Sequence, residues 1–392
     1  MRRIVLAYAE NKPIISAKYA EIMPIYIHQR PEWPKFTWDV AELANSLAAA
    51  WQKQGRLLGR MQSLGLPLQE AAVLKTLTED VIKSSEIEGE NLDQEQVRSS
   101  IARRLGINAG ALSPADRNVE GVVEMMLDAT QNYNKPLAVE RLFGWHASLF
   151  PTGRSNMRKI VVGAWRDDAT DPMQVVSGPE GRSRVHYEAP AAHNLPQETG
   201  AFLKWFESDD KTDKIIRAAL AHLWFVTIHP FDDGNGRIAR AIADTALARA
   251  ENSKQRFYSM SAQIRAERND YYDILERTQK AAHLDVTPWL SWFLACLDRA
   301  LDGSAKILKD VFVKAEFWKT HAQANINVRQ RDMINRLLDG FTGKLTSTKY
   351  AKIEKCSPDT ALRDINVLIE MGILVKEEGG GRSTSYSLVA RS

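Results

Sequence analysis

Apolar side chains recur at steps of three and four residues along most of this chain, a period that predicts amphipathic helices. Between residues 41 and 105 the pattern divides into three helices, with Gly89 placed to end the second and Gly106 the third. Residues 113–150 predict two more, for which Ser113-Pro114 is a typical start signal. The helical period returns at about residue 197 and continues to about residue 300.

Two parts of the chain depart from this period. Residues 1–40 carry Pro24, Pro31 and Pro34 and are predicted to be irregular. Residues 158–190 are rich in Val, Gly, Ser and Arg, with two short extended runs at 173–177 and 183–187. Because Gly-Pro-Glu-Gly separates these runs, they predict a β-hairpin.

The last ninety residues form a separate pattern. A charged helix is expected over about 306–324, and from Val328 the order reads helix, helix, helix, hairpin. In the third of these helices Leu362, Ile365, Leu368 and Ile369 are expected to face inward, and Gly372 to end it. Two strands, 373–375 and 386–388, flank the Gly-rich turn at 379–381.

Composition places the chain among ordinary globular proteins. Its 392 residues suggest two or three domains, and 44% hydrophobic with 26% charged residues are typical values. The net charge of +3 is too small to indicate nucleic acid or membrane by itself. Two cysteines, Cys296 and Cys356, favour a reducing compartment. No apolar run is long enough to cross a membrane, so a cytoplasmic protein without a membrane partner is expected.

The chemistry is concentrated in one stretch, His229-Pro-Phe-Asp-Asp-Gly-Asn-Gly-Arg-Ile-Ala-Arg240. An apolar helix precedes it and a further helix follows, so the stretch is a loop that opens into a helix N-terminus. Gly234, Asn235 and Gly236 can take positive φ, which would direct successive backbone N–H groups into one concavity. With the helix dipole added, this is an anion site, and phosphate is the expected anion.

The side chains of this loop suit phosphoryl-type transfer. Arg237 and Arg240 lie three residues apart on the first turn, and each can clamp phosphate oxygens with two donors. Asp233 is a hard oxygen ligand suited to Mg²⁺. His229 is the side chain there whose unperturbed pKa suits a general base near neutrality. Phe231 is interpreted as an anchor to the core.

The stretch resembles the Fic-family motif, His-x-Phe-x-Asp/Glu-Gly-Asn-Gly-Arg-x-x-Arg, at every specified position. The resemblance covers about residues 80–300 and implies an all-α, Fic-type helical bundle whose β-hairpin at 173–187 is the family's flap. It implies that His229 deprotonates a target hydroxyl, which attacks the α-phosphorus of ATP while pyrophosphate leaves. It further implies Mg²⁺ on Asp233, the α- and β-phosphates on Gly234, Asn235, Gly236 and Arg237, and the γ-phosphate on Arg240.

A second motif precedes the first. Ser84-Ser-Glu-Ile-Glu88-Gly89 lies near the end of a predicted helix, and Ser84 and Glu88, four apart, share a helical face. It resembles the family's inhibitory signature, Ser/Thr-x-x-x-Glu-Gly/Asn, and implies that Glu88 pairs with Arg240. A carboxylate there would take the donors that the γ-phosphate needs and would repel the phosphates.

The segment from Val328 resembles a winged helix-turn-helix. Thr360, Arg363 and Asn366 could face outward, Arg382 could lie on the wing, and basic residues outnumber acidic ones there, eleven to eight. DNA binding through residues 328–392 is one interpretation; dimerisation or another protein contact is the other, and a homodimer stays open.

We therefore expect an N-terminal helical region with the inhibitory helix (1–110), a Fic catalytic core (111–300), and a linker helix with a winged-helix domain (301–392). The predicted activity is a protein adenylyltransferase that transfers AMP to a Ser, Thr or Tyr hydroxyl of a target protein, with self-modification included. One alternative is a DNA-binding regulator whose Fic core senses nucleotide. Others are a Fic enzyme that removes AMP or transfers another nucleotide, and a metal-dependent phosphohydrolase that uses His222, His229 and Asp233.

Overall fold

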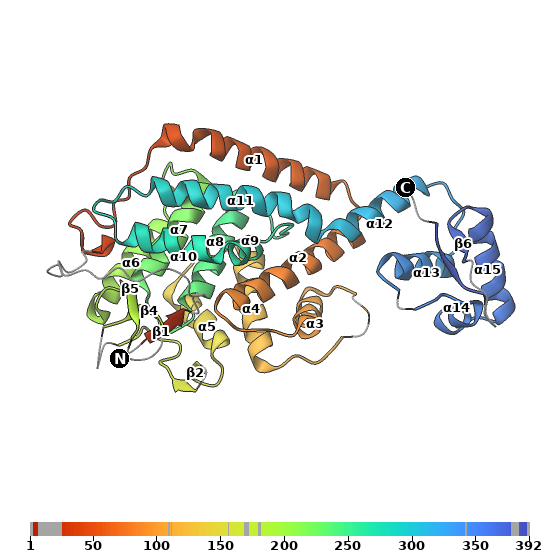
Figure 1. Ribbon diagram of the computed structural model, residues 1–392, viewed down its shortest axis with the longest axis horizontal. Coiled ribbons are helices and arrows are strands. Elements are labelled where there is room, and N and C mark those ends of the chain that lie inside the picture. Colours follow the sequence, from red (N-terminus) through yellow and green to blue (C-terminus); the bar gives the residue numbers. More distant parts are fainter. Residues whose placement is uncertain are drawn as a thin grey trace. The chain divides into compact units, whose positions relative to one another are not determined.

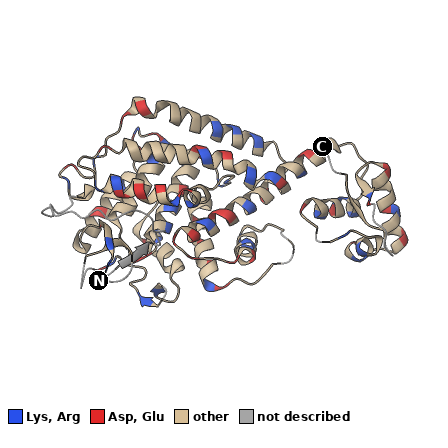
Figure 2. Ribbon diagram, viewed as in Figure 1, with Lys and Arg blue, Asp and Glu red and all other residues tan. Residues whose placement is uncertain are grey.

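The chain folds into two compact units, Met1–Ile307 and Leu308–Ser392. The structure, a computed structural model, describes residues 3–6, 26–108, 110, 112–155, 157–167, 172–178, 182–341, 343–377 and 384–389. Each unit is built mainly of helices (Figure 1). Within the described ranges no helix has both the length and the apolar character that a membrane crossing requires. Acidic and basic side chains lie interspersed on most helices (Figure 2), in keeping with the small net charge.

The first predicted group of helices is present as α1 (Val40–Gln62), α2 (Leu66–Ile87) and α3 (Gln94–Leu105). α2 begins three residues earlier than expected, because Pro67 occupies its first turn, where proline is well tolerated. Gly106 takes a left-handed conformation and ends α3, as predicted. α1 packs along α11 (Thr287–Ile307) on one side of the unit (Figure 1).

The next two helices are α4 (Arg117–Gln131) and α5 (Val139–Leu149), and here the predicted start signal was wrong. α4 begins after Asp116, whose side chain accepts a hydrogen bond from the N–H of Val119 at 2.9 Å. Ser113 is instead held by α3, because its N–H donates to Ser99 Oγ and its carbonyl accepts from Arg103. Residues 113–116 therefore form a connection rather than a first turn.

α7 (Lys214–Ile228) and α8 (Asn235–Glu251) form the centre of the first unit and pack against each other. Nearly every side chain from Ile215 to Ile228 is buried, which is typical of a helix enclosed on all sides. α6 (Leu195–Phe206), α9 (Met260–Ala266) and α10 (Arg268–Gln279) surround this pair with α2, α4 and α11. The twelve-residue motif therefore starts and ends inside the core.

The predicted hairpin is present as β4 (Gln174–Ser177) and β5 (Arg184–Glu188), which pair antiparallel. Part of its expected turn, 179–181, lies outside the described residues. A third strand, β1 (Arg3–Leu6), pairs parallel with β4, so the sheet order is β1-β4-β5. This strand corrects the expectation that residues 1–40 are wholly irregular: a four-residue run can join a sheet supplied by distant residues. The short strands β2 (Arg154–Ser155) and β3 (Arg158–Lys159) form a separate pair.

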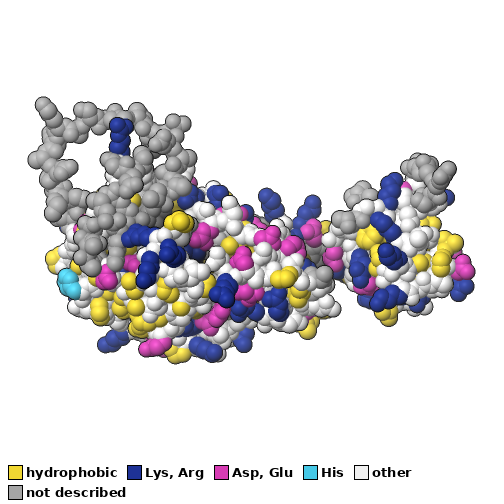
Figure 3. Space-filling model, turned by 90° about the horizontal axis from the view of Figure 1, so that it is seen from below, with side chains coloured by type: hydrophobic (Ala, Val, Ile, Leu, Met, Phe, Trp, Pro, Cys, Tyr) yellow, Lys and Arg dark blue, Asp and Glu magenta, His cyan; other side chains and the backbone are white. Residues whose placement is uncertain are grey.

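The second unit contains α12 (Lys309–Thr320), α13 (Val328–Leu338), α14 (Ser347–Ile353) and α15 (Pro358–Glu370). β6 (Leu374–Lys376) and β7 (Tyr386–Leu388) follow as an antiparallel pair. Leu362 was expected to face inward but is 42% exposed, because the buried face of α15 is formed by Ala361, Ile365 and Leu368. The predicted Gly-rich turn and Arg382 lie outside the described residues. Figure 3 shows basic side chains beside hydrophobic ones on the visible face of this unit.

Candidate active site

The motif begins where α7 ends. His229 takes a left-handed conformation (φ 51°, ψ 57°) and donates its N–H to the carbonyl of Phe225 at 3.0 Å. The carbonyl of His229 accepts a hydrogen bond from Nε of Arg166 at 2.8 Å, and Arg166 also donates its own N–H to Pro230 O. Arg166 is buried. The left-handed conformation of His229 is costly for an L residue. The buried guanidinium of Arg166, which comes from a distant loop, holds His229 in this conformation.

The imidazole of His229 is fixed as one tautomer. Its Nδ1 lies 3.1 Å from Val226 O, which can only accept, so the proton is assigned to Nδ1 and the lone pair to Nε2. Nε2 is buried and has no hydrogen-bond partner among the described residues. Burial lowers the pKa of His229 to about 4, so the ring is neutral at pH 7. The sequence led us to expect an unperturbed histidine pKa for His229, and burial makes that expectation wrong.

Asn235 holds the loop closed. Its Oδ1 accepts from the N–H of Phe231 at 3.0 Å and its Nδ2 donates to Phe231 O at 2.8 Å. Phe231 is fully buried and its ring stacks on His146 with centroids 4.2 Å apart, as an anchor would. Positive φ occurs only at Gly234 (79°) among the three residues expected to share it, because Asn235 and Gly236 already belong to α8. The anion-binding potential thus comes from the N-terminus of α8.

Asp233 lies at the edge of the site and engages two donors. Its Oδ1 accepts from the N–H of Gly234 at 2.6 Å, and its Oδ2 accepts from the hydroxyl of Ser155. Of the residues described, no group of three or more His, Cys, Asp and Glu side chains is arranged to hold a metal ion. A single carboxylate beside an anion site still fits Mg²⁺, which usually binds one or two carboxylates together with substrate phosphates. His222 contacts Tyr271 instead, with Nε2 2.8 Å from the hydroxyl.

The two predicted motifs meet at Arg240. Its Nε donates to Ser84 Oγ at 2.9 Å, and its Nη2 donates to Ser84 O at 2.9 Å and to Glu88 Oε1 at 2.8 Å. Ser84 is fully buried, and Arg240 is 2% exposed. The ion pair joins the C-cap of α2 to the second turn of α8. Glu88 also lies against Gly236, where an added Cβ would come within 2.2 Å of Oε1.

Gly89 sets the direction in which the chain leaves α2. It takes a φ of 84°, its N–H donates to Glu86 O at 3.1 Å, and the N–H of Glu90 donates to Ser85 O at 3.0 Å. This pair of bonds is the Schellman arrangement, which depends on a left-handed residue and so favours glycine. It turns the chain so that Glu90 meets Arg237 on the first turn of α8, beside Glu88 at Gly236.

Several groups at this site were not predicted from the sequence. Arg237 is 2% exposed and its Nη1 lies 2.6 Å from Glu90 Oε2. Ser155 contacts Asp233, and Arg166 contacts the carbonyl of His229. Only Glu90 carried a local signal, since it is an acidic residue directly after the motif at residues 84–89. The other two are brought in by tertiary contacts that have no period in the sequence.

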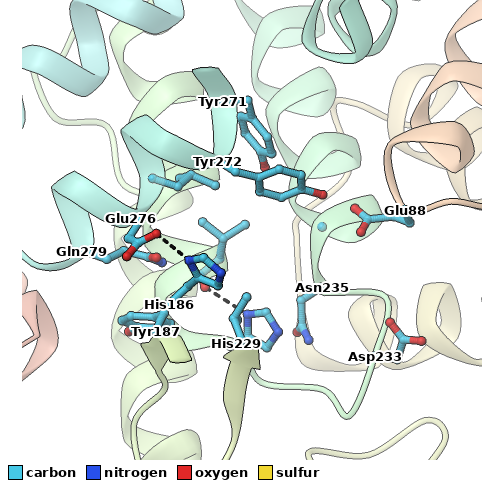
Figure 4. Close-up of a pocket in the computed structure, with 14 residues that line it drawn as sticks. Glu88, His186, Tyr187, His229, Asp233, Asn235, Tyr271, Tyr272, Glu276 and Gln279 are labelled. Carbon is cyan, nitrogen blue, oxygen red and sulfur yellow. Dashed lines mark hydrogen bonds and ion pairs between the residues drawn. The ribbon is translucent and has the colours of Figure 1, made fainter. Parts of the chain in front are cut away.

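A cavity of about 80 Å³ lies between these groups and the hairpin. Figure 4 shows Tyr271 and Tyr272 on one side of it, His229, Asn235 and Asp233 on another, and His186 with Glu276 near the hairpin. His186 Nδ1 lies 2.5 Å from Glu276 Oε2, and its Nε2 lies 2.5 Å from Ser177 Oγ. Both hairpin strands are thereby linked to α10.

Three buried polar atoms of the motif 229–240 share one property. His229 Nε2, Arg237 Nε and Arg240 Nη1 each have no hydrogen-bond partner in the part of the chain that the structure describes. Buried polar atoms are usually paired, so these three are groups that a ligand can satisfy. Two of them belong to guanidinium groups at a helix N-terminus, which suits an anion.

Comparisons with known proteins agree with this fold and motif. The model of the Fic/DOC family matches residues 136–247, and a domain of unknown function, DUF4172, matches residues 26–107. A protein adenylyltransferase Fic from Nematostella vectensis is 36% identical over 116 residues, which cover 29% of this chain and 25% of that protein. One from Aedes aegypti is 32% identical over 137 residues, or 34% of this chain and 25% of that protein.

The chain thus spans about a quarter of the length of these curated relatives. In fold it is similar to a Fic family protein from Desulfovibrio desulfuricans G20, whose crystal structure it matches with a TM-score of 0.58 at 20% identity over 92% of this chain and 99% of that one. The Fic/DOC match and the Fic-family relatives support a Fic family protein.

Proposed function

We propose that this protein is a protein adenylyltransferase that transfers AMP from ATP to a hydroxyl of a target protein, and that Glu88 holds it inactive. The observation that carries the proposal is the set of unpaired buried atoms on His229, Arg237 and Arg240 around the N-terminus of α8. Phosphate oxygens would satisfy both guanidinium groups, and a hydroxyl proton would satisfy the imidazole. The names of the relatives favour AMP as the transferred group.

The proposed reaction gives each of these atoms a role. The target hydroxyl donates its proton to His229 Nε2 as its oxygen forms a bond to the α-phosphorus. The bond from that phosphorus to the bridging oxygen of the β-phosphate breaks, and pyrophosphate leaves. Arg237 and the first N–H groups of α8 would stabilise charge on the α- and β-phosphates, and Arg240 would hold the γ-phosphate. Mg²⁺ on Asp233 would neutralise charge on the leaving pyrophosphate.

Inhibition would act on the same donors. Glu88 occupies Nη2 of Arg240 and lies against Gly236, so it takes the place of the γ-phosphate and adds negative charge beside the others. The hairpin β4–β5 would align the target backbone by strand addition. Because β1 already pairs with β4, a target strand would either replace β1 or pair next to β5.

The test is transfer from ATP labelled in its α-phosphate, measured on the purified chain with Mg²⁺. Glu88→Gly should raise self-labelling well above that of the wild type. His229→Ala added to Glu88→Gly should abolish the label, while thermal melting shows that the fold is kept. Glu86→Gln is the matched control, since Glu86 lies on the same helix but pairs with Lys83 and Arg265. Label that is absent in Glu88→Gly, or retained without His229, would reject the proposal.

We infer a winged-helix module in residues 328–392, supported by the order of its elements and by the exposed Arg363 and Asn366 on α15. Binding of random duplex DNA across a salt series would test whether it contacts DNA, and sedimentation would test whether it forms a dimer. We infer a cytoplasmic protein, since both cysteines are free thiols.

A further inference from the structure

A second carboxylate lies at the site beside Glu88. Glu90 Oε2 is 2.6 Å from Arg237 Nη1, at the point where the chain has turned at Gly89. Arg237 is 2% exposed and stands over the ring of Phe150 at 5.1 Å, so it has little freedom to move away. Its Nε has no partner among the residues described. Glu90 is therefore the anion that this guanidinium holds in the present state.

The surroundings of Glu90 are unfavourable to a negative charge except at Arg237. Burial raises the pKa of the Glu90 carboxyl, and the charges of Asp233 and Glu88 raise it further, while Arg237 lowers it. Three carboxylates thus lie around the N-terminus of α8. A phosphate that replaced Glu90 on Arg237 would use the same donor and would meet the same neighbours.

We propose that Glu90 is a second inhibitory carboxylate, which occupies on Arg237 the place of the α- and β-phosphates. The inference rests on the proposed function, because it uses the phosphate sites assigned there to Arg237 and Arg240. The two glutamates then exclude different ligands. Glu88 opposes the γ-phosphate, which only a triphosphate carries, whereas Glu90 opposes phosphates that a nucleoside diphosphate carries as well.

One backbone feature delivers both glutamates. Glu88 is the C-cap of α2, and Glu90 follows the left-handed Gly89 and donates its N–H to Ser85 O. A displacement of this turn would free Arg240 and Arg237 together. Substitution of either glutamate alone would free only one arginine, so single variants can separate the two effects.

The experiment is calorimetric titration of the 392-residue chain with Mg·ATP and with Mg·ADP. We expect Glu90→Gln to raise the affinity for both nucleotides by about tenfold, with their ratio unchanged. Glu88→Gln should raise the affinity for ATP more than that for ADP. Glu86→Gln is the control of equal charge change on the same helix, and it should alter neither affinity. Because Glu90 is 40% exposed, its substitution is compatible with folding, which the melting temperature checks.

The outcomes separate the two hypotheses. If Glu90→Gln changes neither affinity, or changes ATP binding alone, the second inhibitory role is wrong while the proposed function stands. If neither single variant nor the Glu88→Gln, Glu90→Gln double variant binds Mg·ATP, the proposed function itself is wrong. If Glu90→Gln raises both affinities equally and Glu88→Gln favours ATP, the proposal is confirmed: Glu90 opposes the α- and β-phosphates, and Glu88 opposes the γ-phosphate.

Discussion

Glu88 and Arg240 lie 152 positions apart in the chain, yet their side chains meet at 2.8 Å. Arg240 also donates to the hydroxyl and the carbonyl of Ser84, one helical turn before Glu88. The last turn of α2, together with its cap Glu88, therefore accepts three hydrogen bonds from one guanidinium. Such charge-assisted bonds are the strong ones in proteins, and they hold the arginine in one geometry.

Two substitutions at Glu88 should separate its charge from the space it occupies. Glu88→Gln can still accept a hydrogen bond from Arg240 but carries no charge, so we expect self-labelling between that of the wild type and that of Glu88→Gly. If occupancy alone mattered, Glu88→Gln would match the wild type. If charge alone mattered, it would match Glu88→Gly. Initial rates of transfer from labelled ATP, compared at equal protein and Mg²⁺, decide between these cases.

The burial of His229 predicts how transfer depends on pH. Its pKa of about 4 lies below the ordinary value of 6.5, so the imidazole stays neutral and able to accept a proton as the pH falls through 6. In Glu88→Gly, protonation of His229 should therefore not lower kcat/KM for ATP at pH 6. The pH profile of kcat/KM reports the groups of the free enzyme. An acidic limb centred near pH 6.5 would contradict the buried, neutral imidazole.

Protonation of His229 should reduce kcat at a higher pH than it reduces kcat/KM. The acidic limb of the kcat profile should therefore lie at higher pH than the acidic limb of the kcat/KM profile. Bound phosphates bring negative charge near His229 and favour its protonated form. A separation of the two limbs in that direction would show that nucleotide and base interact. Identical limbs would mean that the phosphates do not lie near the imidazole.

The sequence predicted the helices better than it predicted the contacts that shape the site. Periodicity and glycine positions located α2, α3 and the hairpin, because these depend on residues close together in the chain. The Ser113-Pro114 signal failed because Ser113 is held by α3 through Ser99 and Arg103. Local patterns carry no information on such partners.

The same limit applied inside the motif. The spacing indicated an anion site, but it could not show that only Gly234 takes positive φ, since that follows from where α8 begins. Nor could it show that burial moves the pKa of His229, or that Arg166 holds its carbonyl from 63 positions away. These facts depend on the packing of α7 and α8 against the rest of the unit.

The hairpin is linked to α10 through Glu276, which predicts a role for that carboxylate in keeping β5 in place. Its oxygens lie 2.5 Å from His186 Nδ1, 2.7 Å from Arg184 Nη2 and 2.7 Å from Lys280 Nζ. Burial alone would raise the pKa of Glu276, but hydrogen bonds from His186 and Lys280 outweigh it and lower the pKa to about 2. The contribution to stability is present above the unfolded pKa, near 4.3, and is lost as the pH falls toward 2.

Glu276→Gln should therefore loosen the hairpin at neutral pH. We expect faster amide exchange over residues 184–188 and slower transfer in the Glu88→Gly background, with the melting temperature lowered by a few degrees at most. Hydrogen exchange read by mass spectrometry checks the first effect. Arg277→Gln is the control, since Arg277 is an exposed charge on the same helix. Unchanged exchange in β5 would show that Glu276 does not hold the hairpin.

A buried pair of carboxyl groups joins α2 to α8 and predicts a dependence of stability on pH. Asp80 of α2 and Asp244 of α8 are both buried, and Asp244 also pairs with Arg256 at 2.9 Å. Burial raises the pKa of Asp244 well above its ordinary value, and the charge of Asp80 and a hydrogen bond to it raise it further, against the lowering effect of Arg256. Two carboxyl groups can share such a bond only when one of them keeps its proton.

The sign of the effect follows from the raised pKa. The protonated pair makes its whole contribution to stability below the pKa of Asp244 in the unfolded chain, near 3.9. That contribution is lost as the pH rises through the pKa of Asp244 in the folded protein. Asp244→Asn keeps a donor toward Asp80 and an acceptor toward Arg256 without a proton to lose. Relative to this variant, the wild type should lose up to about 1.4 kcal/mol per pH unit between the two pKa values.

Chemical denaturation of both proteins from pH 5 to pH 9 measures this difference, with exposed Asp302→Asn as the control for charge. We expect the free energy of unfolding of Asp244→Asn to exceed that of the wild type by a margin that grows with pH. Because Glu88 caps α2, loss of the shared proton should also weaken the hold of α2 and Glu88 on α8. Self-labelling of the wild type should then rise with pH more steeply than that of Asp244→Asn, whereas parallel profiles would show that the pair does not govern the helix.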